Sequence, residues 1–92
     1  MEEHANRMEL ARHALGLPNE RGRSYRNRFL CSAPGANFRA WSAMVADGDA
    51  IMVQRVKDFG STWFHLTRQG AEKALLPGET LCPEDFPAAQ AA

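Results

Sequence analysis

The first regular hydrophobic pattern along the chain predicts a helix over residues 2–15. One face carries residues spaced by four, three and four positions: His4, Met8, Ala11 and Leu15. Gly16, Leu17 and Pro18 come next. Glycine readily takes the left-handed conformation that ends a helix, an apolar residue after it folds back on the last turn, and proline cannot continue the helix. We therefore expect this helix to end at Leu15.

Two further helical patterns lie later in the chain. Asn37 is a favourable N-cap, and Asp47-Gly48 closes the stretch that follows it. The apolar side of that stretch holds Phe38, Trp41, Met44 and Val45. Because two of these are aromatic, we expect this helix to dominate the core. A last short helix is predicted from Arg68 to Leu76, capped by Thr67 and ended by Pro77-Gly78.

Alternating patterns predict strands between the helices. In residues 24–31, alternation places Tyr25, Asn27, Phe29 and Cys31 on one side, which favours a half-exposed strand over a short helix pairing Tyr25 with Phe29. Residues 32–36 form a turn by composition. The runs 50–56 and 62–67 are separated by five residues that include a glycine, which is typical of a β-hairpin.

Together these patterns predict a small α+β domain in the order helix–strand–helix–hairpin–helix. It covers residues 1–78, and residues 79–92 form a flexible acidic and Ala-rich tail. The predicted core contains Met8, Leu15, Phe29, Trp41, Met44, Val45, Ile51, Val53, Phe64, Leu66, Ala71 and Leu75. A chain of 92 residues makes one domain at most and buries too little surface to be very stable alone, so a partner or a homodimer is expected.

Composition narrows the cellular setting. The apolar share of 45% and the charged share of 24% are ordinary globular values and exclude wholesale disorder. No apolar run approaches the length of a membrane span, and the acidic N-terminus lacks the apolar core of a secretory signal. Two cysteines are too few for a disulfide scaffold. We therefore expect no membrane contact and a reducing, cytoplasmic setting.

The zero net charge conceals an uneven distribution. Residues 21–46 hold five arginines and no acidic residue, whereas residues 76–92 hold three acidic residues and no basic one. Guanidinium groups bind phosphates and carboxylates bidentately, and Tyr25 and Phe29 among them could stack on bases. The cluster therefore fits nucleic acid or an acidic protein surface, and a merely solvated strand face is the third interpretation.

The predicted partner-binding residues combine this cluster with exposed aromatics. Phe59 at the hairpin and Trp63 opposite Phe64 are costly to expose unless a partner, a second copy or the chain itself covers them. The full set is Arg21, Arg23, Tyr25, Arg26, Arg28, Arg39, Arg55, Lys57, Phe59 and Trp63.

Reactive chemistry is not expected. The histidines lie apart, and the zinc-binding spacings Cys-x-x-Cys and His-Glu-x-x-His do not occur, so no metal and no cofactor are predicted. Cys31 with His65 is a conceivable nucleophile–base pair on facing strands, but a structural thiol is far commoner. No catalytic residue is therefore assigned, and we expect that the protein is not an enzyme.

Two stretches of the second half resemble a winged-helix domain. They read Trp41-x-x-Met44-Val45-x-x-Gly48 and, after the hairpin, Trp63-Phe64-x-Leu66-Thr67-x-x-Gly70-x-x-x-Ala74-Leu75. The resemblance implies a helix, a wing hairpin and a strand that runs into a closing helix, in which Gly70 lets helix and strand approach closely. Residues 25–31 stand where a helix-turn-helix belongs, which argues against reading of the DNA major groove.

A wider likeness covers nearly the whole chain. The segments 11–18, 24–29, 66–71, 77–79 and 84–87 are similar to small uncharacterised proteins of phages and prophages. This resemblance implies no chemistry, but it implies a role in phage growth or in the conflict with the host. The resulting expectation is a non-enzymatic phage-type binding protein that docks on a host or phage protein or nucleoprotein complex, such as an anti-CRISPR-like inhibitor. The alternative is a winged-helix nucleic-acid-binding regulator.

Overall fold

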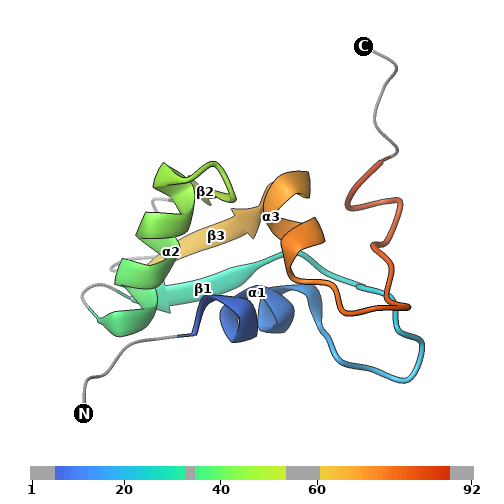
Figure 1. Ribbon diagram of the computed structural model, residues 1–92. Helices are drawn as coiled ribbons and strands as arrows, with labels where there is room; N and C mark the ends of the chain where they lie inside the picture. The colour runs from blue at the N-terminus through green and yellow to red at the C-terminus, as the bar shows by residue number, and fades with distance from the viewer. Residues whose placement is uncertain (1–5, 33–34, 54–60, 88–92) are drawn as a thin grey trace.

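The computed structural model describes residues 6–32, 35–53 and 61–87. Its elements follow the predicted order (Figure 1). They are α1 (Arg7–Leu15), β1 (Phe29–Ser32), α2 (Ala36–Ala46), β2 (Ala50–Val53), β3 (Ser61–Leu66) and α3 (Arg68–Lys73). The α+β class is therefore confirmed. Across the described ranges, no helix has the length and apolar character needed to cross a membrane.

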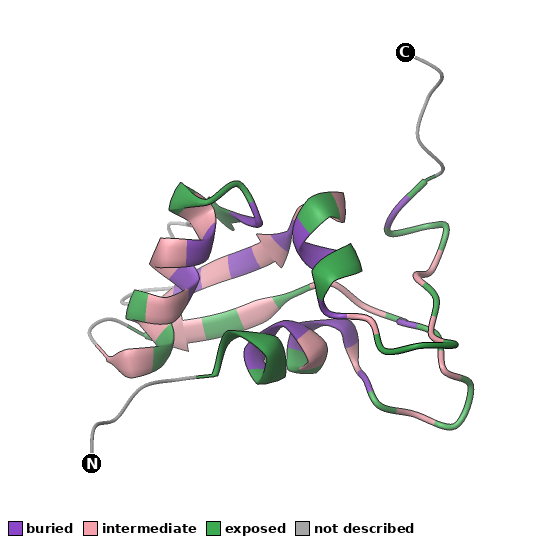
Figure 2. Ribbon diagram, viewed as in Figure 1, coloured by how far each residue is buried: buried purple, intermediate pink, exposed green. Residues whose placement is uncertain are grey.

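The three strands form one antiparallel sheet with β3 in the centre. The order is β1-β3-β2, and the strand of residues 24–31 is confirmed in its second half, where Phe29 pairs with Phe64. Burial alternates along β3, so Thr62, Phe64 and Leu66 are buried while the residues between them are half-buried (Figure 2). The helices pack on the face that carries Phe64.

The core is centred on aromatic contacts between α2 and the sheet. Trp41 is fully buried and stacks on Phe64, with ring centroids 5.4 Å apart. Phe29 lies against Trp41 at 5.4 Å, and Phe38 meets Phe64 edge-on at 5.7 Å. The second helix thus brings its aromatic side chains to the core as predicted, with Trp41 and Met44 buried, while α1 buries four residues of its own. The buried cluster also contains Leu10, Ala11, Ala14, Leu15, Leu17, Met44, Ala50, Leu66, Ala71, Ala74 and Phe86.

The prediction placed the wrong face of β2 in the core. Ile51 is 50% exposed and Val53 is half-buried, while Ala50 is buried opposite Leu66. Successive side chains of a strand point to opposite faces, so a one-residue change of register exchanges the two sets. Ala50 follows Asp49, where α3 comes closest to the sheet, and a small side chain faces the helices there.

Helix α1 begins later than predicted. Asn6 is its N-cap, with the side-chain Oδ1 accepting a hydrogen bond from the Glu9 N–H at 3.1 Å. Ala11 and Leu15 face the core as predicted, but Leu10 is buried beside them and Met8 is 36% exposed. Its end is as predicted, since Gly16 has φ 82° and the Leu17 N–H bonds the Arg12 carbonyl. His4 lies outside the described residues.

The other helices differ from prediction at one end each. Gly35, and not Asn37, is the N-cap of α2, and Asn37 lies exposed in its first turn. Thr67 caps α3 as predicted, because its Oγ1 accepts from the Gly70 N–H at 3.1 Å. Helix α3 ends at Lys73 and not at Leu76.

The segment after Gly78 was predicted as a free tail, but residues 79–87 lie against the domain. Phe86 is buried, and the Arg68 side chain donates to the carbonyls of Phe86 and Pro87. A single buried aromatic residue among polar ones gives no periodic pattern, so the sequence did not reveal that this segment packs on the domain. The segment is held by contacts with residues far away in the chain. Residues 88–92 lie outside the described chain.

Candidate partner-binding surface

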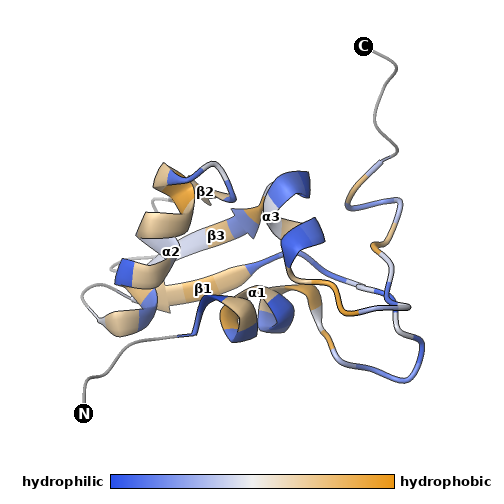
Figure 3. Ribbon diagram, viewed as in Figure 1, coloured by the Kyte–Doolittle hydropathy of each residue, from blue (hydrophilic) through white to orange (hydrophobic). Residues whose placement is uncertain are grey.

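The connection between α1 and β1 carries four of the five clustered arginines. We call residues 19–28 the arginine loop, and Figure 3 shows its first turn as hydrophilic. Arg21, Arg23 and Arg28 are exposed. Within the ranges 6–32, 35–53 and 61–87, their side chains make no hydrogen bond or ion pair with the rest of the chain. Their charge therefore faces solvent uncompensated.

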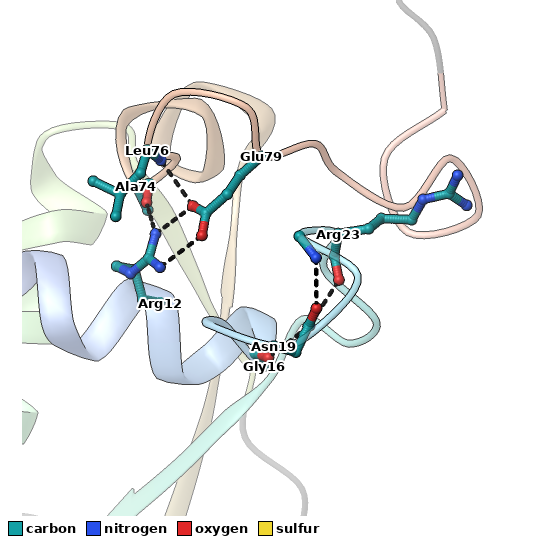
Figure 4. Close-up of polar contacts among 8 residues, drawn as sticks. Arg12, Gly16, Asn19, Arg23, Ala74, Leu76 and Glu79 are labelled. Atoms are coloured by element: carbon teal, nitrogen blue, oxygen red, sulfur yellow. Dashed lines mark hydrogen bonds and ion pairs between the residues drawn. The ribbon is translucent and has the colours of Figure 1, made fainter.

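The Asn19 side chain organises the first half of the loop (Figure 4). Its Oδ1 accepts from the backbone N–H groups of Arg21 and Gly22, each at 2.9 Å. Its Nδ2 donates to the carbonyls of Gly16 at 3.0 Å and Arg23 at 2.9 Å. One amide thus ties the end of α1 to the turn that carries two arginines, which is a common use of Asn in turns.

A second brace comes from the C-terminal segment. Arg23 and Thr80 form a parallel β-bridge, in which the Thr80 N–H donates to the Gly22 carbonyl at 2.9 Å and the Ser24 N–H to the Thr80 carbonyl at 3.0 Å. The buried Ser24 hydroxyl accepts from the Cys82 N–H at 2.8 Å. The backbone that bears Arg23 is therefore held on both sides.

Tyr25 is fixed at the surface by the end of α1. Its N–H bonds the Leu15 carbonyl at 3.1 Å, and its ring lies directly against Gly16, where an added Cβ would stand 2.2 Å from the ring. The Arg26 guanidinium lies over the ring, 5.3 Å from its centroid, and donates to the His13 carbonyl at 2.7 Å. Tyr25 nevertheless stays 62% exposed. Arg26 is thus engaged internally, unlike Arg21, Arg23 and Arg28.

These residues surround a hollow of about 450 Å³. Its lining consists of Asn19, Glu20, Arg21, Arg23, Ser24 and Tyr25. Two arginines and a tyrosine therefore line one depression together with one glutamate, and exposed arginines suit binding of an anionic group.

Another hollow, of about 310 Å³, lies where α1, the end of α2 and α3 meet. Its charged rim is already paired, since Arg7 contacts Asp47 at 2.8 Å and Lys73 contacts Asp49 at 3.0 Å. Hydrogen bonding from Gln69 and then Lys73 lowers the pKa of Asp49, which keeps that carboxylate charged and bound. This hollow offers no free charge to a partner.

The C-terminal segment is anchored by an ion pair between Arg12 and Glu79 (Figure 4). The two groups meet through two contacts, of 2.5 and 2.8 Å, and Arg12 also donates to the Ala74 carbonyl at 2.9 Å. Glu79 Oε1 further accepts from the Leu76 N–H at 2.8 Å. The hydrogen bond from Arg12, followed by that from Leu76, lowers the pKa of Glu79 to about 2. Glu79, one of the three acidic residues in residues 76–92, thus pairs with Arg12 of α1 and not with the arginine loop.

The Arg12–Glu79 ion pair makes the free energy of unfolding depend on pH. Folding lowers the Glu79 pKa from its ordinary 4.5 to about 2, so the stabilisation is complete above about pH 4.5 and is lost as the pH falls to about 2. We expect the free energy of unfolding to differ between wild type and Glu79→Gln at pH 6 and to converge near pH 2, as measured by urea denaturation. Glu84→Gln, at an exposed position in the same segment, is the control and should follow wild type. Equal pH profiles for Glu79→Gln and wild type would contradict the pairing.

The structure separates the other predicted site residues from the hollow. Arg39 is exposed on α2, which Figure 1 shows at the opposite end of β1 from the arginine loop. Trp63 lies half-buried on β3, on the sheet face opposite Phe64 as predicted, next to the exposed Leu30 of β1. The predicted contacts at Arg55, Lys57 and Phe59 lie outside the described residues.

Cys31 and His65 do not meet. Cys31 pairs with Thr62 on the helix-covered side of the sheet, whereas His65 alternates with Phe64 and lies on the other side. Burial raises the pKa of the Cys31 thiol, which keeps it protonated. His65 Nδ1 is 2.6 Å from the Asn27 carbonyl oxygen. The nucleophile–base alternative is therefore wrong for this pair.

Sequence reasoning missed Asn19, Glu79 and Thr80. An Asn in a polar turn is a recognisable signal, because its side chain commonly bonds nearby backbone. Glu79 and Thr80 gave none, since their contacts with α1 and the arginine loop are with residues 56 to 67 positions earlier in the chain. Comparisons with protein-family models, characterised proteins and solved structures find no match. The function is therefore inferred from the contacts and charges of the chain itself.

Proposed function

We propose that this chain is a non-enzymatic binding protein that docks on a macromolecular partner through the arginine loop. Arg21, Arg23 and Arg28 supply charge, and Tyr25 supplies contact area. The observation that carries the proposal is that these guanidiniums are exposed and unpaired within the described chain, on a backbone that Asn19 and Thr80 hold in place. Exposed charges that stay unpaired within the described chain, on a backbone held in place, favour recognition over general solubility.

We further propose that the partner belongs to a phage or its bacterial host, as the resemblance of the sequence to small phage proteins would imply. A small inhibitor needs only a stable fold and a complementary patch to cover a surface that a defence complex uses for nucleic acid. An anti-CRISPR-like inhibitor acting in the host cytoplasm is the form of the proposed function that we favour.

A second copy of the chain on the open sheet face, where Leu30 and Ile51 are exposed, is a separate proposal that light scattering tests.

The test is capture of a partner from nuclease-treated and untreated bacterial lysates. We expect wild type to retain a protein that the Arg21→Glu, Arg23→Glu, Arg28→Glu variant does not. All three positions are exposed, so this variant should keep the wild-type circular dichroism spectrum. Arg39→Glu, a charge reversal on α2, should capture the protein as wild type does. Equal capture by the triple variant would contradict docking through the loop.

A winged-helix nucleic-acid-binding regulator is the second candidate. It is supported by the β1-β3-β2 order, in which the hairpin strand pairs with the strand before α2, and by the Thr67 cap with Gly70 behind it. Against it, residues 16–28 contain no helix that could complete a helix-turn-helix. A DNA binder should lose affinity with salt on any duplex, with a log–log slope of about −0.9 per phosphate contact. Absence of a mobility shift at low salt would remove this candidate.

A further inference from the structure

We infer that the hollow at Arg21, Arg23 and Tyr25 is a preformed site for carboxylate groups of an acidic protein segment. This inference rests on the proposed docking function and names its partner. The two arginines lie two residues apart on one turn, and Tyr25 stands beside them at the rim. A glutamate or aspartate of the partner would enter this hollow and bind the arginines that line it, and its neighbouring side chain would contact the exposed Tyr25 ring.

The first argument is that the loop is already in its binding shape. The Asn19 side chain makes four hydrogen bonds within residues 16–23, and the bridge to Thr80 fixes the far side. Tyr25 is held against Gly16 while more than half of it remains exposed. A loop whose backbone is already fixed loses less conformational entropy on binding, and Tyr and Arg are enriched among the energetic anchors of interfaces.

The second argument is that free charge is concentrated here. The five clustered arginines were candidates together, but Arg26 bonds the His13 carbonyl and Arg39 lies apart on α2. Arg21 and Arg23 are the two that line one hollow. A guanidinium can bind a carboxylate through two parallel hydrogen bonds, so a pair of them favours an acidic side chain.

The third argument favours protein over nucleic acid. Glu20 lines the same hollow, and Glu84 and Asp85 are exposed just beyond the segment that bridges to Arg23. The whole chain has no net charge and a pI near 6.8, whereas nucleic-acid-binding domains are commonly strongly basic. A phosphate backbone needs a continuous positive track, and these acids would interrupt it. A single acidic side chain needs only the two arginines.

The test is a pair of NMR titrations of ¹⁵N-labelled protein. One probe is a glutamate-rich peptide with one leucine, and the other is a thymidine oligonucleotide of equal charge. We expect the peptide to shift the side-chain N–H signals of Arg21 and Arg23 and the Tyr25 amide. Arg21→Ala with Arg23→Ala should weaken peptide binding about tenfold or more, while Arg39→Ala leaves it unchanged.

Asn19→Ala separates preformation from charge. It leaves every arginine in place but removes the four hydrogen bonds that shape the turn. We expect the peptide to bind several-fold more weakly to this variant. Unchanged peptide affinity in a variant whose loop amides have lost their protection would overturn preformation.

Other outcomes overturn the inference in distinct ways. Tighter binding of the oligonucleotide at the same signals would replace the acidic protein by nucleic acid. Shifts of Arg28 or Arg39 alone would leave docking through arginine intact but remove the hollow as the site. Absence of shifts with both probes would also remove the hollow, and the lysate experiment with the triple Glu variant would then decide the proposed function separately.

Discussion

Gly70→Ala is expected to destabilise the fold by about 3 kcal/mol, although alanine is the better helix former. An added Cβ at Gly70 would lie 2.0 Å from the Asp49 carbonyl oxygen and 2.8 Å from its carbonyl carbon. Both are backbone atoms, so no side-chain rotation relieves the clash. The turn cannot yield freely either, because the Asp49 carbonyl accepts from the Thr67 N–H at 3.0 Å. Helix α3 must therefore move away from the sheet.

Urea denaturation followed by circular dichroism measures this effect. Gly35→Ala is the matched control, since an added Cβ there meets nothing within 4 Å and the backbone has φ 166°, which is ordinary extended conformation. The control should cost less than about 1 kcal/mol, as expected for an N-cap change from glycine to alanine. Equal losses in the two variants would show that α3 does not approach the sheet as closely as described.

Trp41→Ala should cost about 3–5 kcal/mol, the usual range for truncating a buried large aromatic side chain. Trp41 is fully buried between Phe29 and Phe64 in the middle of the core. A domain of this size has a stability near the lower end of the 5–15 kcal/mol range of native proteins, so the loss removes most of it. We expect broad, weakly cooperative thermal unfolding in the variant.

Trp41→Phe provides the comparison for that experiment. The buried Trp41 Nε1–H has no acceptor among the described residues, and a buried unsatisfied donor is itself destabilising. Phenylalanine keeps an aromatic ring against Phe64 and removes this donor, so its cost should be well below that of alanine. A cooperative and wild-type-like transition for Trp41→Ala would contradict the aromatic core.

Local signals in the sequence were sufficient for the order of elements. Gly16 marks the C-terminus of α1 through its backbone conformation, and Thr67 marks the N-terminus of α3 through its side chain. Both residues act on groups only a few positions away in the chain. The choice of core face in β2 was wrong because alternation alone does not say which face is covered. That choice depends on pairing of Ala50 with Leu66, a contact across the hairpin.

The site was predictable only in part for the same reason. Charge clustering identified Arg21, Arg23 and Arg28 without any knowledge of the fold. It could not show that the Arg26 guanidinium donates a hydrogen bond to the His13 carbonyl. Nor could it show that Glu79 pairs with Arg12, which leaves the charges of Arg21, Arg23 and Arg28 without that acidic partner. These outcomes depend on where the end of α1 and the C-terminal segment lie in space.

Amide hydrogen exchange of the free protein tests the central claim, that the chain itself holds the arginine loop in a binding-ready shape. The N–H groups of Gly22, Ser24 and Tyr25 donate to Asn19, Thr80 and Leu15. We expect them to exchange far more slowly than in an unfolded chain, and Asn19→Ala to release Gly22 first. Exchange of all three at unfolded-chain rates in the folded wild type would contradict the claim.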